Sequence, residues 1–137
     1  WSDSYNYRQF YTDVLVPFRP GGSRRYRTAC HDVTTDTILM PEPQLAAPGT
    51  VLVVDGIFLH RNELATSWDL SVFLDVPFIE TARRMALRDG SNPDPDHHTM
   101  RRYVEAQRRY FRECKPQDRA TILIANSNHE SPVVLRG

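Results

Sequence analysis

The sequence predicts an α/β protein built around a parallel sheet. Three apolar runs rich in β-branched residues cover residues 50–56, 70–76 and 120–126. None of them alternates between apolar and polar residues, and such runs are typical of strands covered on both faces. Helical patterns separate the second run from the third, so strands and helices alternate along the chain.

The length and composition favour one globular domain. The chain has 137 residues, enough for a single α/β domain over residues 1–137. Hydrophobic residues make up 40% and charged residues 25%, which argues against disorder. No apolar run reaches the roughly 18–20 residues of a membrane helix, so we expect no membrane partner. Cys30 and Cys114 lie far apart without a C-x-x-C motif, which favours a reducing compartment, the cytoplasm.

The charged residues balance in number but not in type. The formal net charge is zero, so global electrostatics give no reason to expect a nucleic-acid partner. All but one of the 17 basic residues are arginines, and Lys115 is the exception. The planar guanidinium group matches phosphate oxygens, so some of these arginines are candidates for phosphate contacts. Compositional bias of the genome and an arginine-rich RNA-binding module are the alternative explanations.

The first third of the chain reads as a helix followed by extended segments. Apolar residues at helical spacing predict an amphipathic helix over residues 5–18, ended by Pro17 and Pro20. Residues 24–40 are polar and β-branched, which predicts a hairpin of two short extended pieces around residues 32–36. Residues 41–49 are expected to form a surface connection, which leads into the first apolar run at residues 50–56.

Helices and strands are predicted for the rest of the chain. Residues 77–87 have the pattern of a helix that begins at a proline and ends before Asp89 and Gly90. Residues 99–114 predict a long, arginine-rich helix that ends before a proline. Residues 133–135 are expected to add an edge strand to the sheet.

Four stretches together suggest a family. They are PGGSRRYR at residues 20–27, VLVVDGIF at 51–58, WDLSVFLDVP at 68–77 and RMALRD at 84–89. In this order the chain resembles P-loop kinases of the uridine kinase and phosphoribulokinase group, and most closely the uridine kinase-like ATP-binding proteins of bacteria. The resemblance covers most of the chain. It implies a P-loop NTPase fold like that of nucleoside kinases, with an arginine-bearing lid at about residues 83–110.

One hallmark of that group does not occur in the printed sequence. The phosphate loop G-x-x-x-x-G-K-[ST] is absent, and Lys115 is followed by proline. In the family this loop lies upstream of the segment that resembles the start of this chain. We therefore expect the first strand and the phosphate loop to precede it, so that residues 1–137 are the C-terminal portion of a longer kinase, inactive by themselves. A relative that lacks the loop is the alternative.

The resemblance also implies an activity. An enzyme of this group transfers a phosphoryl group from ATP, with Mg²⁺, to a hydroxyl of a small molecule. The expected acceptor is a nucleoside such as uridine, or another small metabolite. A non-catalytic nucleotide-binding or regulatory protein on the same scaffold is the alternative, and self-association into a homo-oligomer is left open.

Asp55 and three residues near the lid carry the expected phosphate chemistry. Asp55 ends an apolar run and, by the resemblance, holds Mg²⁺. Arg84 and Arg88 are four residues apart and share a helix face, where they would stabilise the transferred phosphoryl group, Arg88 also contacting ATP. Asn126 follows the last buried run, where the family contacts adenine.

The arginines also have a structural alternative. They could belong to a solvated helix face and pair with Glu80 or Asp89. Arg83 is expected to point elsewhere. The spacing of the family motif nevertheless leaves open whether Arg83 or Arg84 corresponds to its first arginine.

Five further residues are assigned to catalysis or to the substrate. Asp3 resembles the general base near the acceptor hydroxyl, although a helix N-cap is the alternative. Tyr26, Arg27 and His31 match a segment that contacts the nucleoside base and ribose, with a surface hairpin as the alternative. His60 follows the Asp-Gly turn and could bind substrate, with a surface loop as the alternative.

Overall fold

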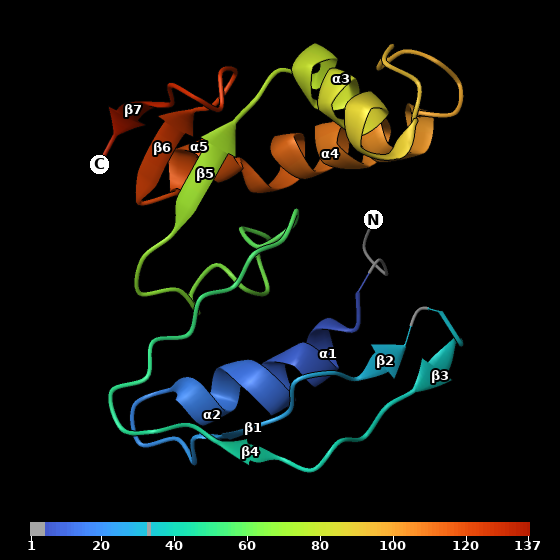
Figure 1. Cartoon of the computed structure of the whole chain (residues 1–137). Coiled ribbons are helices and arrows are strands. Elements are labelled where there is room, and N and C mark those ends of the chain that lie inside the picture. The colour runs from blue at the N-terminus through green and yellow to red at the C-terminus, as the bar shows by residue number, and fades with distance from the viewer. Residues whose placement is uncertain (1–4, 33) are drawn as a thin grey trace. The chain divides into compact units, whose positions relative to one another are not determined.

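The computed structural model describes residues 5–32 and 34–137, which form two compact units, Trp1–Asp55 and Gly56–Gly137 (Figure 1). The length of the chain predicts one domain, whereas each unit here has its own secondary structure. Among the described residues, no helix combines the length and apolarity that a membrane crossing requires.

The first unit begins with one continuous helical rod. Its three segments are α1 (Tyr7–Phe10), the π-helical η1 (Tyr11–Leu15) and α2 (Val16–Phe18). The Asn6 side chain caps the rod, because its Oδ1 accepts the backbone N–H of Gln9 at 3.0 Å. The predicted helix over residues 5–18 is confirmed. The expectation that Pro17 helps to end it is wrong, since α2 continues through this residue.

Pro17 is tolerated because another segment satisfies the helix backbone. Proline has no N–H to donate to the carbonyl four residues earlier, which here belongs to Asp13. The backbone N–H of Arg27 donates to that oxygen at 3.1 Å. The π-helical turn η1 directly precedes α2, which contains the proline. The extended segment after the helix is thereby attached to the helix.

Two pairs of short antiparallel strands complete the first unit. They are β1 (Arg25–Tyr26) with β4 (Gln44–Leu45), and β2 (His31–Asp32) with β3 (Thr37–Ile38). The second pair confirms the hairpin predicted around residues 32–36. Asp32 shapes its turn, because its carboxylate accepts the N–H of Thr34 at 2.8 Å.

The apolar run at residues 50–56 does not form a strand. Val51 and Val53 are 81% and 85% exposed, so the prediction of a buried strand here is wrong. A strand requires a neighbouring strand to pair its backbone N–H and C=O groups. No strand in the described part of the chain pairs with this run, so its β-branched residues cannot form the backbone hydrogen bonds of a sheet.

The second unit contains a three-stranded mixed sheet and three helices. The elements are β5 (Val72–Asp75), α3 (Phe78–Asp89), α4 (Arg101–Cys114), α5 (Pro116–Arg119), β6 (Ile122–Ala125) and β7 (Val133–Arg136). Strand β6 is central, parallel to β5 and antiparallel to β7 (Figure 1). Both strands and both helices predicted between residues 70 and 126 are confirmed, as is the edge strand at 133–135.

The core of this unit lies between α3 and α4 and continues onto the sheet. Ala82, Met100 and Val104 are buried together. Phe111 of α4 stacks on Phe78 of α3, with ring centroids 5.7 Å apart, and meets the ring of Phe73 of β5 edge-on at the same distance. Aromatic contacts of this kind add to the burial of apolar area. Helix α4 thus covers one face of β5.

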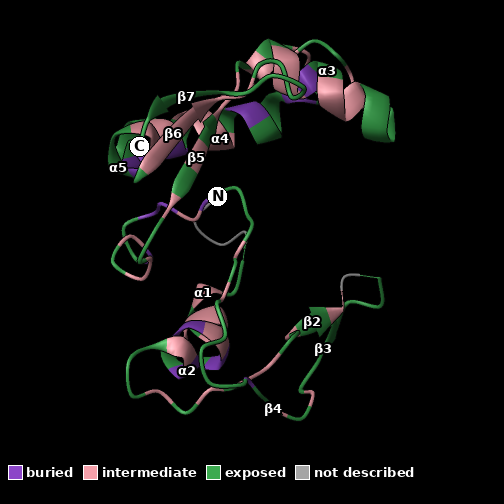
Figure 2. Cartoon of the chain, turned by 60° about the vertical axis from the view of Figure 1, so that its left-hand side comes forward, coloured by how far each residue is buried: buried purple, intermediate pink, exposed green. Residues whose placement is uncertain are grey.

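The opposite face of β5 is open in the second unit. Val72 and Leu74 are 44% and 51% exposed, while Phe73 between them is half-buried. Figure 2 draws β5 in the colours of exposed and intermediate residues. Side chains alternate between the two faces of a strand, so only one face is covered. The expectation that helices cover both faces is therefore wrong for this strand.

Candidate functional site

The candidate site lies at the carboxyl ends of the two parallel strands. Asp75 and Ala125 are the paired last residues of β5 and β6, and the N–H of Asn126 donates to the Asp75 carbonyl at 3.0 Å. Asn128 holds the following loop, because its Oδ1 accepts the N–H of Glu130 at 3.1 Å. Ligands of open α/β sheets bind at this edge. We refer to residues 126–131 as the edge loop.

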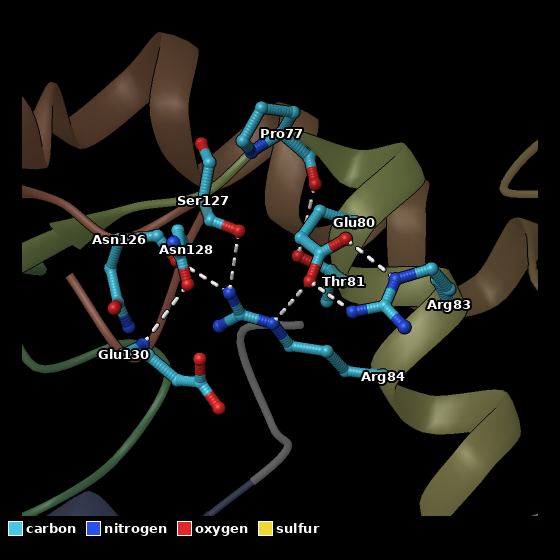
Figure 3. A network of polar contacts seen from close by, with 9 residues as sticks. All are labelled: Pro77, Glu80, Thr81, Arg83, Arg84, Asn126, Ser127, Asn128 and Glu130. Carbon is cyan, nitrogen blue, oxygen red and sulfur yellow. Dashed lines mark hydrogen bonds and ion pairs between the residues drawn. The ribbon is translucent and has the colours of Figure 1, made fainter. Parts of the chain in front are cut away.

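Arg84 connects helix α3 to the edge loop (Figure 3). Its Nη2 donates to the backbone carbonyls of Asn126 at 2.6 Å and Ser127 at 3.0 Å, while its Nε donates to Glu80 Oε1 at 2.7 Å. A guanidinium group can make such simultaneous bonds because its donors are fixed in one plane. Arg84 is therefore engaged on both sides, and its contacts hold the loop that carries Asn126.

Glu80 binds two arginines at once. Arg83 donates to both carboxylate oxygens at 2.8 Å, and Arg84 donates to one of them. The hydrogen bonds from Arg83 and then from Arg84 lower the pKa of Glu80 to about 2, so this carboxylate is ionised at neutral pH. The expectation that Arg83 points away from Arg84 is wrong, since both meet at Glu80. The structural alternative of an Arg84–Glu80 pair is present.

Arg88 differs from Arg84 in its surroundings. It lies in the last turn of α3, and its side chain is 73% exposed. Its Nη2 donates to Asp89 Oδ2 at 2.9 Å. Hydrogen bonds from Ser91 and then from Arg88 lower the pKa of Asp89 to about 2. An exposed pair of this type contributes little to stability, so Arg88 can exchange its partner for a ligand at small cost.

Asp55 is the last residue of the first unit, and α3 belongs to the second unit. It is exposed and follows an irregular segment rather than a strand. Within the described ranges, no three His, Cys, Asp or Glu residues cluster as metal ligands. Mg²⁺ is commonly held by one or two carboxylates together with phosphates and water. Asp55 does not end a strand, and its expected place at the carboxyl edge of a sheet is wrong.

Tyr26 and His31 contact different parts of the first unit. The hydroxyl of Tyr26 donates to Gln44 Oε1 at 3.1 Å, across the β1–β4 pair. The His31 Nε2 lies 3.0 Å from Asp36 Oδ1 inside the β2–β3 hairpin. Each side chain thus has a partner within its own strand pair, as expected for the surface-hairpin alternative.

Arg27 is engaged by the helix rather than presented to a ligand. Its Nη1 lies 3.4 Å from Asp13 Oδ1, and its Nε donates to the Pro41 carbonyl at 3.1 Å. The buried Asp13 also accepts a hydrogen bond from Gln9. Asp13 is not among the residues that the sequence pattern predicts to be functional. Its place four residues before Pro17 is the signal that could have pointed to it.

His60 is buried, with 7% of its surface exposed, so the surface-loop alternative is wrong. Its backbone N–H donates to the Tyr110 hydroxyl at 3.0 Å, and its carbonyl accepts from Arg119 at 3.1 Å. The ring meets Phe73 edge-on, and Nε2 has no hydrogen-bond partner among the described residues. Burial, and then the charge of Arg119, lower the pKa of the imidazole. This burial disfavours the substrate-binding role expected of His60.

Asp3, the expected general base, lies outside the described residues. No family model, curated protein or solved structure matches the chain. Three features of the chain itself bear on its function. These are the edge loop, the arginines of α3 and the motifs that resemble the uridine kinase group.

Proposed function

We propose that this chain is part of an ATP-dependent phosphotransferase with a P-loop kinase-like fold. It transfers the γ-phosphoryl group to a hydroxyl of a nucleoside such as uridine, or of another small metabolite. The observation that carries the proposal is the arrangement of α3 beside the carboxyl ends of β5 and β6. Arg84 reaches the loop at that edge, and Arg88 stands exposed one turn further along the helix. The resemblance supplies the reaction class.

The two arginines have different roles in this proposal. The exposed guanidinium of Arg88 binds phosphoryl oxygens, where it offsets the charge that develops during transfer. Arg84 is already bound to Glu80 and to two backbone carbonyls, which favours a positioning role. Through these bonds it fixes the loop that carries Asn126, the residue assigned to the adenine by the resemblance.

The remaining roles come from the resemblance. Asp55 holds Mg²⁺, which neutralises the charge of the nucleotide phosphates when it is bound. Asp3 accepts the proton of the attacking hydroxyl. Tyr26 and His31 are the proposed substrate contacts. An ATP-dependent reaction and the free thiols of the described Cys30 and Cys114 agree with a cytoplasmic location.

The test is phosphoryl transfer by the product of the full reading frame that encodes this chain. ATP labelled at the γ-phosphate is incubated with Mg²⁺ and a panel of nucleosides that includes uridine. We expect the label to appear on a nucleoside 5′-hydroxyl, and Asp55→Asn to reduce the rate strongly. Transfer to no acceptor on the panel or in a metabolite extract would contradict the proposal.

A regulatory nucleotide-binding protein is the second candidate. The observation that favours it is the engagement of Arg83 and Arg84 by Glu80, which leaves fewer unoccupied cations at the site than a phosphotransferase commonly uses. Under this alternative, equilibrium dialysis detects ATP binding to the same protein, while no acceptor becomes labelled.

A further inference from the structure

A hollow of about 370 Å³ lies within the first unit, where the end of α2 meets residues 46–50. The residues that matter for its chemistry are Phe18, Arg19, Gly22, Arg24 and Thr50. Its volume lies in the range of small-molecule sites. None of the residues assigned to phosphoryl transfer lines it, so it is separate from the candidate site.

The lining of the hollow is positively charged. Arg19 and Arg24 are its charged residues, and no acidic side chain occurs among the described residues that line it. Two guanidinium groups without a neighbouring carboxylate create a local potential that attracts anions. Phosphate is the preferred anion of such a pair, because each guanidinium can donate two hydrogen bonds to its oxygens.

Arg24 is fixed at this place by its backbone. Its N–H donates to the Pro17 carbonyl at 3.0 Å, its carbonyl accepts the N–H of Ala46 at 2.9 Å, and its Nη1 donates to the Ala46 carbonyl at 3.1 Å. The residue adopts a left-handed conformation with φ of 58°. For a residue other than glycine this costs of order 1 kcal/mol or more, and such strain is concentrated at functional sites.

Arg19 is fixed by the turn and by an aromatic ring. Its guanidinium carbon lies 4.9 Å from the centroid of the Tyr11 ring, a cation–π contact. The N–H of Gly22 donates to the Arg19 carbonyl at 2.8 Å. A Cβ at Gly22 would lie 2.5 Å from the Pro17 carbonyl oxygen, so only glycine permits this close turn. The turn brings both arginines to one hollow.

Two of the carbonyl groups at the end of α2 have hydrogen-bond partners in this turn. A helix C-terminus normally repels negative charge because its last carbonyls lack partners. In this turn the Val16 carbonyl accepts the N–H of Arg19 at 3.2 Å, and the Pro17 carbonyl accepts the N–H of Arg24. Both oxygens are therefore satisfied by the residues that carry the cations.

We propose that this hollow binds the phosphate group of a small molecule through Arg19 and Arg24. The Thr50 hydroxyl provides an additional donor, and Phe18 provides an apolar wall. The site would be available in this chain whether or not phosphoryl transfer occurs. Free phosphate, pyrophosphate and the phosphate of a nucleotide share the chemistry that it recognises.

Isothermal titration of the full chain with pyrophosphate tests the site. We expect saturable binding at one site, and a loss of affinity of about tenfold or more for Arg19→Gln and for Arg24→Gln. Arg25→Gln is the matched control, because this exposed neighbour carries the same charge and does not line the hollow. The affinity of the Arg25→Gln variant for pyrophosphate should stay within about twofold of that of the unchanged chain. The absence of pyrophosphate binding, or equal losses in all three variants, would overturn the proposal.

Two further experiments distinguish a loss of folding from a loss of binding and identify the source of the bound phosphate group. Arg24→Gly removes the cation but accepts the positive φ without strain, so it should stay folded by amide NMR and still lose affinity. Retained affinity in this variant would contradict the proposal. Binding of uridine monophosphate without binding of uridine would indicate a nucleotide phosphate, whereas pyrophosphate alone would indicate an inorganic anion. Arg109→Gln, at an exposed position of α4 outside both sites, should leave every one of these affinities unchanged.

Discussion

Arg27 binds Asp13 twice, once through its backbone and once through its side chain. Its N–H donates to the Asp13 carbonyl at 3.1 Å, and its guanidinium lies 3.4 Å from the carboxylate. The first bond satisfies an oxygen to which Pro17, four residues later, cannot donate. The second pairs a carboxylate that is largely buried. Together these contacts connect the helical rod of the first unit to the segment that follows it.

Replacing Arg27 should therefore weaken the helix. Arg27→Ala removes the partner of a largely buried carboxylate, and we expect a loss of about 1–2 kcal/mol in local stability. Hydrogen exchange of the amides in residues 7–18 measures it. Arg25→Ala, an exposed change two residues earlier in the chain, should leave the exchange rates unaltered. Equal exchange in the two variants would refute this role of Arg27.

The Tyr110 hydroxyl should stabilise the second unit. It accepts the N–H of His60, and Tyr110 is buried. Tyr110→Phe leaves that buried donor without this acceptor, which should lower the free energy of unfolding by about 1–3 kcal/mol. Urea denaturation measures the change, and Tyr103→Phe is the control because Tyr103 is 53% exposed. A similar midpoint for both variants would show that the buried hydrogen bond adds nothing.

The stability of the second unit should fall as the pH is lowered below about 6.5. Burial and Arg119 depress the pKa of His60 from the value of 6.5 that the unfolded chain retains. The unfolded state therefore binds a proton before the folded state does, so the contribution of this group is complete above pH 6.5 and declines below it.

Urea midpoints at pH 7.5 and 5.5 check this dependence. Trp68 is a suitable fluorescent probe when Trp1 is replaced by Phe, because its Nε1 donates to the Leu59 carbonyl beside His60. His60→Gln should reduce the change in midpoint, whereas His98→Gln, at an exposed position, should preserve it. A larger change in the His60 variant would mean that the sign of its pKa shift is wrong.

Arg84 should order the edge loop, and Arg83 should not. Both bind Glu80, but only Arg84 donates to the carbonyls of Asn126 and Ser127. Arg84→Ala should therefore accelerate amide exchange in residues 126–131 several-fold, since each lost hydrogen bond is worth about 1 kcal/mol. Arg83→Ala is the matched control. If Arg84→Ala and Arg83→Ala accelerate amide exchange in the edge loop equally, the positioning role of Arg84 is contradicted.

Local pattern was sufficient to predict most elements of the second unit. The runs around Phe73 and Leu123 form strands, and the predicted helix over residues 99–114 ends where α4 ends, whereas α3 continues to Asp89, two residues beyond the predicted end of the helix over 77–87. In the second unit the apolar residues of these strands and helices pack against other elements of the same unit. The run that includes Val53 has an equally strong strand pattern but no described partner strand, and a strand cannot form from propensity alone.

The candidate residues were harder to predict because their roles depend on contacts distant in sequence. The i, i+4 pair of Glu80 and Arg84 follows from helical spacing, but the bonds from Arg84 to the edge loop span 42 and 43 residues. The backbone N–H of the buried His60 donates to the hydroxyl of Tyr110, 50 residues away. The spacing of apolar residues indicates which residues share a face of one helix or strand. It gives no information on contacts between residues distant in sequence.

The rate of phosphoryl transfer in the Arg88→Gln variant of the full-length protein tests the central claim most directly. Arg109→Gln is the control, since Arg109 is an exposed arginine on α4 that pairs with Glu113 at 2.7 Å. If Arg88 contacts the transferred phosphoryl group, its loss should lower kcat by about 100-fold or more, with Arg109→Gln within about twofold of the unchanged protein. A kcat that is the same in both variants would contradict the account.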